Sequence, residues 1–92
     1  MWKKHPLFND YEANEHGEIR CLNYGKQPGN TKTIKQTKRK DGYLIINLRE
    51  QHYFAHRFVW ECFYGIMDEK MCIDHISTDR TDNRLENLKI CT

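Results

Sequence analysis

The spacing of apolar residues changes once along this chain, and that change restricts the fold more than any other feature of the sequence. Residues 43–48 are rich in β-branched and aromatic side chains, which is typical of a strand, and Leu44, Ile46 and Leu48 would face the core. Across residues 55–63 the apolar positions recur every three or four residues, as on one face of a helix. The pattern therefore predicts an α+β fold with a small antiparallel β-sheet and one packed helix.

Turn-forming residues and short runs complete the N-terminal part. Residues 11–14 and 18–22 predict two strands around a turn at Gly17. Residues 23–33 are polar and contain two glycines and a proline, so we expect a surface loop there. A tight turn at residues 41–42 precedes the strand of residues 43–48.

The C-terminal part is predicted in the same way. A turn at residues 49–51 leads into a short strand at 52–54, and Gly65 is expected to end the helix, because glycine readily adopts the left-handed conformation at a helix C-terminus. A strand at 71–74, a polar loop and a short helix at 83–88 follow. We expect residues 1–92 to form a single domain.

Size and composition limit the kind of site that this domain can hold. A chain of 92 residues buries only a modest fraction of its surface, so we expect an open site rather than a large enclosed pocket. A hydrophobic content of 38% beside a charged content of 30% indicates a folded domain. No apolar run approaches the roughly 20 residues that cross a bilayer, and the N-terminus lacks the apolar stretch of a signal peptide. We therefore expect a cytoplasmic protein with no membrane partner.

The cysteines are widely spaced and form no C-x-x-C pair, so the sequence predicts buried thiols rather than a disulfide framework. A structural Zn²⁺ site built from all of them is the less favoured alternative, because zinc ligands usually come in close pairs. The residues concerned are Cys21, Cys62, Cys72 and Cys91.

Charge is distributed unevenly. Residues 1–60 hold 11 Lys and Arg against 6 Asp and Glu, whereas residues 61–92 hold 4 against 7. The densest basic run contains no acid, which suits a phosphate backbone as partner, although a solvated loop explains the run equally well when it is taken alone. The run consists of Lys32, Lys35, Lys38, Arg39 and Lys40.

The segment of residues 73–88 carries the chemistry. Asp74 offers a hard oxygen ligand for Mg²⁺ or Mn²⁺, and it directly precedes the imidazole of His75, a group that exchanges protons near neutral pH. Asn83 and Asn87 are four residues apart and share one side of a helix. Each residue also has a structural explanation as a turn, surface or capping residue. The functional interpretation accounts for the whole spacing at once.

Two stretches of this sequence, AHRFVWECFYG at 55–65 and IDHISTDRTDNRLENL at 73–88, resemble the HNH, or ββα-metal, endonucleases of phages and mobile introns. YEANEHGEIRCLNYGK at 11–26 and DGYLIINL at 41–48 resemble the small strand module that often precedes such motifs. The resemblance implies a basic strand module at 1–52 that contacts DNA. It also implies a C-terminal ββα-metal (HNH) motif at 53–92.

The resemblance also implies roles for individual residues. His75 would be the general base, Asp74 a metal ligand, and Asn83 the central Asn that holds the loop and orients the base. The family's third motif residue usually lies beyond the Glu-Asn-Leu, so Asn87 is the nearest stand-in as a second metal ligand. A glycine is common in the family at the place of Thr78, so this turn is expected to be strained.

Three further residues are candidates near the site. Arg57 and Arg84 could grip a phosphate in a two-pronged fashion, or equally form surface ion pairs with Glu61 and Glu86. His56 is expected either to support the site or to form a hydrogen bond within the core.

The sequence therefore predicts a metal-dependent DNA endonuclease or nickase that uses Mg²⁺ or Mn²⁺ and acts in the host cytoplasm if it is phage-encoded. The main alternative is a DNA-binding module without catalysis, with a degenerate or incomplete HNH fold. An interaction protein without DNA affinity is a third alternative. Besides DNA, a second copy of the chain or a larger phage assembly could be a partner.

Overall fold

The N-terminal sheet is antiparallel, with strand order β1-β2-β3-β4, in a computed structural model that describes residues 1–24, 28–68 and 70–91. Its strands are β1 (Trp2–Lys4), β2 (Tyr11–Asn14), β3 (Ile19–Cys21) and β4 (Lys32–Thr33). The predicted strands at 11–14 and 18–22 are confirmed as β2 and β3, and the turn between them contains Gly17 at φ 86°. Part of the loop predicted at 23–33, residues 25–27, lies outside the described residues.

Strands β5 (Thr37–Lys38), β6 (Leu44–Leu48) and β7 (Gln51–Phe54) form a second antiparallel sheet. Ile46 and Leu48 are buried and Leu44 packs against the core, as the sequence predicts. Arg49 and Glu50 both have positive φ and make the tight turn between β6 and β7. The sequence did not indicate β1, β4 or β5, because two or three residues are too few to establish an alternating pattern.

Helix α1 (Ala55–Tyr64) follows β7 directly and packs its apolar face on both sheets. Ala55, Phe58 and Val59 are fully buried, while the opposite face is open to solvent at Tyr64. The helix ends at Gly65, which has φ 91° and whose amide donates to the Glu61 carbonyl at 2.9 Å. The predicted helix and its stop signal are therefore confirmed.

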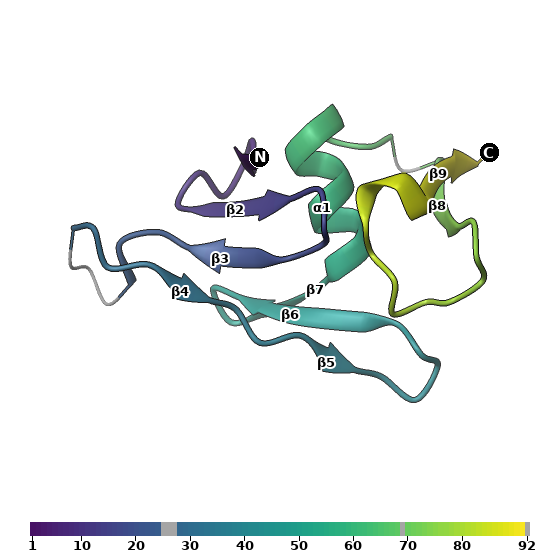
Figure 1. Ribbon diagram of the computed structural model, residues 1–92, viewed down its shortest axis with the longest axis horizontal. Coiled ribbons are helices and arrows are strands. Elements are labelled where there is room, and N and C mark those ends of the chain that lie inside the picture. The colour runs from purple at the N-terminus through teal and green to yellow at the C-terminus, as the bar shows by residue number, and fades with distance from the viewer. Residues whose placement is uncertain (25–27, 69, 92) are drawn as a thin grey trace.

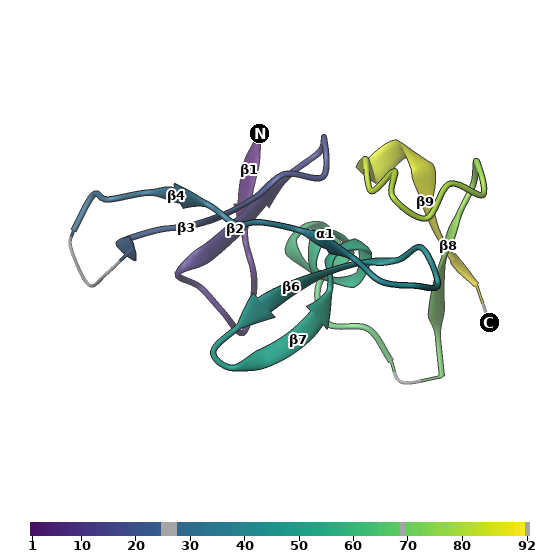
Figure 2. The ribbon, with the colours of Figure 1, turned by 90° about the horizontal axis from the view of Figure 1, so that it is seen from below.

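Beyond α1, strands β8 (Cys72–His75) and β9 (Leu88–Cys91) form an antiparallel pair, with the 3-10 helix η2 (Leu85–Asn87) between them. Figures 1 and 2 show this pair on the other side of α1 from β2 and β3. The helix predicted at 83–88 is wrong in extent. Leu88 starts β9 and is buried opposite His75, so the chain leaves the helical turn after Asn87.

The core draws on every part of the chain. Ala13 and Ile19 from the first sheet lie in one apolar cluster with Phe58 of α1, Ile73 of β8 and Leu88 of β9. This shared burial fixes β8 and β9 against the body of the molecule. In the described part of the chain no helix is long and apolar enough to cross a membrane.

The prediction of four buried thiols is only half correct. Cys21 and Cys62 are buried, whereas Cys72 is exposed and Cys91 is half-buried. Cys72 and Cys91 are directly opposite each other where β8 and β9 extend beyond the core, and their Sγ atoms are 2.7 Å apart. Burial raises the pKa of the Cys62 thiol to about 12, so that thiol stays protonated.

Candidate active site

His75, the last residue of β8, is 5% exposed, and its Nε2 lies 2.7 Å from Oδ1 of Asn83. An amide oxygen can only accept a hydrogen bond, so Nε2 carries the proton and donates it. The Nδ1 atom then keeps its lone pair. Nδ1 has no hydrogen-bond partner among the described residues and is not a buried atom, so it reaches solvent. This hydrogen bond leaves His75 with a proton-accepting nitrogen that no described residue binds.

Asn83 is held in place by the turn between β2 and β3. A side chain on Gly17 would put its Cβ 2.8 Å from the Asn83 carbonyl oxygen, closer than real Cβ contacts, so this approach requires glycine. The Leu85 amide donates to the Glu15 carbonyl at 2.8 Å in the same turn. The sequence marked Gly17 as a turn residue only, whereas the structure makes it a support for the partner of His75.

Asn87 holds the loop between β8 and η2. Its Oδ1 accepts a hydrogen bond from the Ser77 amide at 3.0 Å, and its Nδ2 donates to the Asp82 carbonyl at 2.9 Å. The side chain is 6% exposed. Both ends of the carboxamide are therefore engaged within the loop. The role of Asn87 as a second metal ligand stays a prediction.

Asp74 points to the solvent-exposed face of β8, and its Oδ1 accepts the His75 amide at 3.1 Å. Over residues 1–24, 28–68 and 70–91, no three His, Cys, Asp or Glu side chains gather in a group that could hold a metal ion. The chain thus offers Asp74 as an exposed carboxylate directly before His75 in the sequence. This donor set fits a hydrated Mg²⁺ or Mn²⁺, because such ions keep several waters and take their remaining ligands from substrate phosphates. It does not fit a closed zinc site.

Aromatic rings surround His75 on the side of α1. The His56 ring lies 5.1 Å from the His75 ring in a T-shaped contact, and the Tyr43 ring lies 6.0 Å away. The pKa of His56 is lowered to about 4, mainly because the ring is buried and further because His75 and Arg57 are close to it. His56 is therefore neutral near pH 7. Its Nδ1 is buried without a partner among the described residues.

Comparison with known proteins identifies this segment. Residues 53–92 match the family of HNH endonucleases. This C-terminal segment therefore carries the HNH endonuclease motif. A solved structure described as "DNA binding and cleavage by the HNH homing endonuclease I-HmuI" matches the whole chain with a TM-score of 0.81 at 27% identity. The match covers 100% of this chain and 52% of that one, so the chain spans about half the length of that endonuclease. No curated protein matches the chain.

The predicted HNH family of the homing type and the α+β fold are thus confirmed. The structural match also includes the strand module that precedes the HNH motif, because it extends over the complete chain. HNH nucleases generally use divalent metal ions, which agrees with the exposed carboxylate of Asp74.

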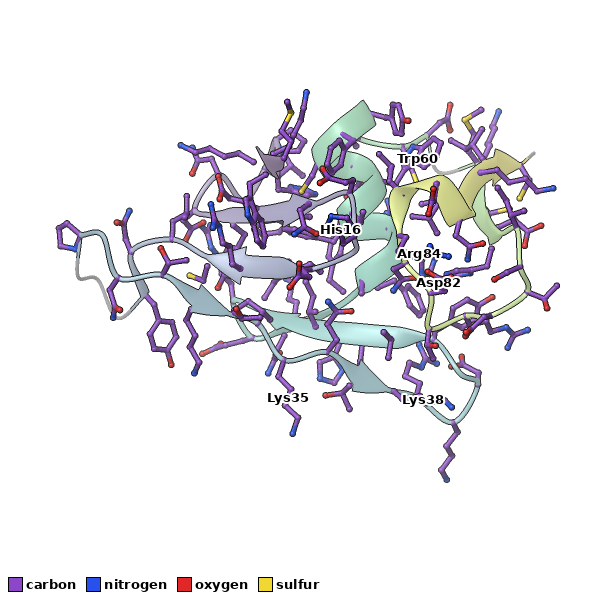
Figure 3. All side chains as sticks on the ribbon, viewed as in Figure 1. His16, Lys35, Lys38, Trp60, Asp82 and Arg84 are labelled. Atoms are coloured by element: carbon purple, nitrogen blue, oxygen red, sulfur yellow. The ribbon has the colours of Figure 1, made fainter. Side chains whose placement is uncertain are left out.

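The two arginines predicted near the HNH motif are both engaged in ion pairs. Arg57 donates from Nε to Glu61 at 3.2 Å and keeps its side chain 42% exposed, so its terminal nitrogens remain available. Arg84 binds Asp82 at 2.9 Å and Glu86 at 2.8 Å, and Figure 3 shows Asp82 and Arg84 next to each other. The ion-pair alternative thus holds for both residues, and Arg84 uses all of its nitrogens in it.

All five residues of the predicted basic run are exposed. Lys35 and Lys38 project from the edge formed by β5, away from the body of the molecule (Figure 3). Arg39 lies 5.2 Å from the centre of the Phe54 ring and pairs with Asp41 at 3.4 Å. Lys32 contacts the hydroxyl of Tyr24 at 3.2 Å.

Arg80 and Tyr43 were missed by the sequence analysis. The guanidinium of Arg80 lies 4.7 Å from the centre of the Tyr43 ring and donates to the Asp41 carbonyl at 2.5 Å. This contact ties the loop after His75 to the turn between β5 and β6, and the two segments lie side by side in Figures 1 and 2. Nothing in the local spacing of a polar loop indicates a contact that spans 39 residues.

Proposed function

We propose that this chain is a metal-dependent DNA endonuclease or nickase with His75 as its general base. The observation that carries the proposal is the hydrogen bond from Nε2 of His75 to Asn83, which assigns the proton to Nε2 and presents Nδ1 to solvent. A general base must offer a lone pair within reach of the water that it deprotonates. Asn83 is a positioning residue that fixes the tautomer and the ring orientation.

In this mechanism Nδ1 of His75 removes a proton from a water, which attacks the phosphorus in line with the leaving oxygen. Asp74 would hold a divalent cation, and such an ion neutralises charge that develops on the phosphate and the leaving oxygen. Asn87 holds the loop through both ends of its carboxamide, and its Oδ1 keeps a second lone pair that could bind the ion. Its hydrogen bonds keep the backbone after His75 in a fixed conformation.

DNA is the proposed partner. Lys35, Lys38 and Lys40 are exposed and form no ion pair with another described residue, so they are free to contact phosphates. Arg80 links this basic edge to the loop of the HNH motif through Asp41. We propose that DNA binds along the β5 edge, passes the contact between Arg80 and Asp41, and reaches Nδ1 of His75. Arg57 is a second candidate for a phosphate near the cut.

The test is cleavage of supercoiled plasmid with Mg²⁺ or Mn²⁺, with and without a chelator. His75→Ala should lower the rate about 10²- to 10⁴-fold and leave DNA affinity nearly unchanged, since general-base catalysis contributes that much. His52→Ala is the matched control, because His52 is exposed on β7 and precedes the residues of the HNH motif. Cleavage by His75→Ala at the wild-type rate would refute the assignment. Metal-independent DNA binding without cleavage by the wild type would instead favour the non-catalytic DNA-binding module.

A further inference from the structure

A pocket of about 280 Å³ opens beside the HNH motif, between the end of β7, the start of α1 and the start of β8. Tyr43, Phe54 and His56 supply aromatic walls, Met67 and Met71 supply flexible apolar ones, and Arg57 lies at its edge. Its volume is close to the lower limit of roughly 300 Å³ for pockets that hold small ligands. The pocket therefore suits a flat ring system rather than a long chain.

The walls of this pocket are arranged as a cluster of rings. Tyr43 and Phe54 meet edge to face at 5.6 Å, and His56 lies 5.3 Å from each of them. Methionine side chains adapt to the shape of an aromatic partner and attract it through their polarisable sulfur. Aromatic and apolar surfaces of this kind bind nucleobases by stacking, whatever the base, because every base has a π-face.

Positive charge lies around the same rings. The guanidinium of Arg39 is 5.2 Å from the centre of the Phe54 ring, and that of Arg80 is 4.7 Å from the centre of the Tyr43 ring. Arg57 lines the pocket itself, whereas Arg39 and Arg80 lie against two of the rings that form its wall. A nucleotide within a strand has a phosphate on the 5′ and on the 3′ side of its sugar, so an apolar pocket with a guanidinium at its edge can hold the base and contact a phosphate.

The pocket is one side chain away from the proposed base. His56 forms part of its wall and contacts the His75 ring at 5.1 Å, and Ile73 at its far wall is two residues before His75. In paired duplex DNA both faces of each base are covered by neighbouring bases. A base can reach this pocket only after leaving the stack, which requires least energy where it is unpaired.

We propose that this pocket receives a nucleobase displaced from the stack next to the scissile phosphate, so that DNA with an unpaired base at the cut is the preferred substrate. This inference rests on the proposed nuclease function and adds the substrate class. Stacking on the rings offsets part of the free energy that is needed to displace the base. An unpaired base needs less of this free energy, so the barrier to cleavage is lower. We expect about tenfold faster cleavage of such DNA than of the fully paired duplex.

The cleavage experiment compares two duplexes that differ only in one bulged 2-aminopurine beside the mapped cut. The wild type should prefer the bulged duplex about tenfold. Met71→Trp, which fills the pocket, and Phe54→Leu, which removes a ring, should bring the ratio close to one. Ile66→Trp adds the same ring to an exposed position outside the pocket and should keep the wild-type ratio. A wild-type ratio near one, or an unchanged ratio in Met71→Trp, would overturn the proposal.

A binding experiment separates this inference from the nuclease function. With a chelator present to prevent cleavage, saturating protein should quench 2-aminopurine fluorescence in the bulged duplex, because the base stacks on Tyr43 and Phe54. Phe54→Leu should lose most of this quenching, while Ile66→Trp retains it. If no DNA is cut but the quenching occurs, the pocket stands and the nuclease fails. If DNA is cut and saturating protein leaves the fluorescence unchanged, the pocket proposal fails alone.

Discussion

Thr78 adopts a backbone conformation that its side chain disfavours. Its φ is 66°, in the left-handed region, and its amide closes the turn onto the His75 carbonyl at 3.0 Å. A β-branched residue is strained there, because its Cβ approaches the backbone oxygen. The expectation of a strained turn at Thr78, drawn from the resemblance, is thus confirmed, and the strain lies three residues from the proposed base.

Thr78→Gly should stabilise the protein by about 1 kcal/mol, because relief of left-handed strain exceeds the loss of backbone entropy at glycine. The measurement is the free energy of unfolding from urea denaturation. Thr31→Gly is the control, since Thr31 is an exposed loop residue without positive φ and should lose stability. Equal destabilisation by the two substitutions would contradict the argument.

Glu61 is a buried carboxylate that depends on three partners. It is 1% exposed and accepts hydrogen bonds from His5 at 2.9 Å, from Arg57 at 3.2 Å and from the Tyr53 hydroxyl. Burial alone raises the pKa of the Glu61 carboxyl, but the hydrogen bonds from these side chains and from the Met67 amide together lower it from 4.5 to about 2. The folded state therefore favours the ionised form.

The pH dependence of stability follows from that shift. Because the folded pKa of Glu61 is below the unfolded one, its contribution is complete above pH 4.5 and is lost as the pH falls towards about 2. Glu61→Gln should cost about 2 kcal/mol near pH 7, since it weakens buried hydrogen bonds to a charged group. The difference from wild type should shrink below pH 4.5, as measured by thermal unfolding across pH.

Glu86→Gln supplies the comparison, because the Glu86 side chain is 73% exposed and its replacement should stay within about 0.5 kcal/mol of wild type. If Glu61→Gln lost the same stability at pH 3 as at pH 7, the carboxylate would not be the source of the effect.

At the scale of elements, the site depends on a turn that belongs to another sheet. The β2–β3 turn packs its backbone on Asn83 at Gly17 and accepts the Leu85 amide at Glu15. Gln36, between β4 and β5, donates to the Gly17 carbonyl at 2.9 Å and holds the turn from the other side. The strand module therefore helps to orient His75, because its β2–β3 turn holds the backbone of Asn83, whose side chain binds the imidazole.

Gly17→Ala should impair catalysis more than its effect on stability suggests. The added Cβ would meet the Asn83 carbonyl at 2.8 Å, and a displacement of about 1 Å at a catalytic group can cost about 10²-fold in rate. Cleavage rate and unfolding free energy are measured on the same preparation.

Gly29→Ala is a matched variant for this test. Gly29 has a similar φ of 81° but nothing within 4 Å of its added Cβ, so the backbone strain is alike and the contact with the site is missing. Gly29→Ala should lose stability from backbone strain alone, Gly17→Ala should lose more because of the contact with Asn83, and only Gly17→Ala should lose activity in the folded protein. Parallel losses of activity in the two would remove Gly17 from the support of Asn83.

At the scale of the molecule, the basic edge and the HNH motif are parts of one packed body. The apolar cluster joins the first sheet to α1, β8 and β9, and Arg80 joins the motif to the β5–β6 turn. A phosphate backbone that contacts Lys35, Lys38 and Lys40 is thereby placed at a fixed position relative to His75. The proposed function requires that these cations supply affinity and that His75 supplies rate.

This division predicts a change in salt dependence. Each lysine that contacts a phosphate contributes about 0.9 to the slope of log affinity against log salt concentration, so replacing Lys35, Lys38 and Lys40 with alanine should lower the slope by up to about 3. Fluorescence anisotropy across a salt series measures it. Lys4→Ala, on the exposed side of β1, should leave the slope unchanged. A triple variant with the wild-type slope would place DNA elsewhere on the molecule.

The sequence by itself determined the features that depend on neighbouring residues. Strands β2, β6 and β7, helix α1 and its end at Gly65 follow from the local alternation or periodicity of apolar residues, which burial on one face imposes. The HNH family followed from the resemblance of residues 55–65 and 73–88 to that family. The strain at Thr78 followed from a glycine expected in its place.

The tertiary structure alone decided how these residues are used. Asn87 is bound within the loop by contacts to Ser77 and Asp82, Asn83 fixes the tautomer of His75, and Gly17 supports Asn83 from another sheet. The Arg80 contact with Tyr43 and Asp41 depends on two turns that are far apart in the chain. Local spacing reflects burial on one face of an element, whereas hydrogen-bond partners depend on which elements the core brings together.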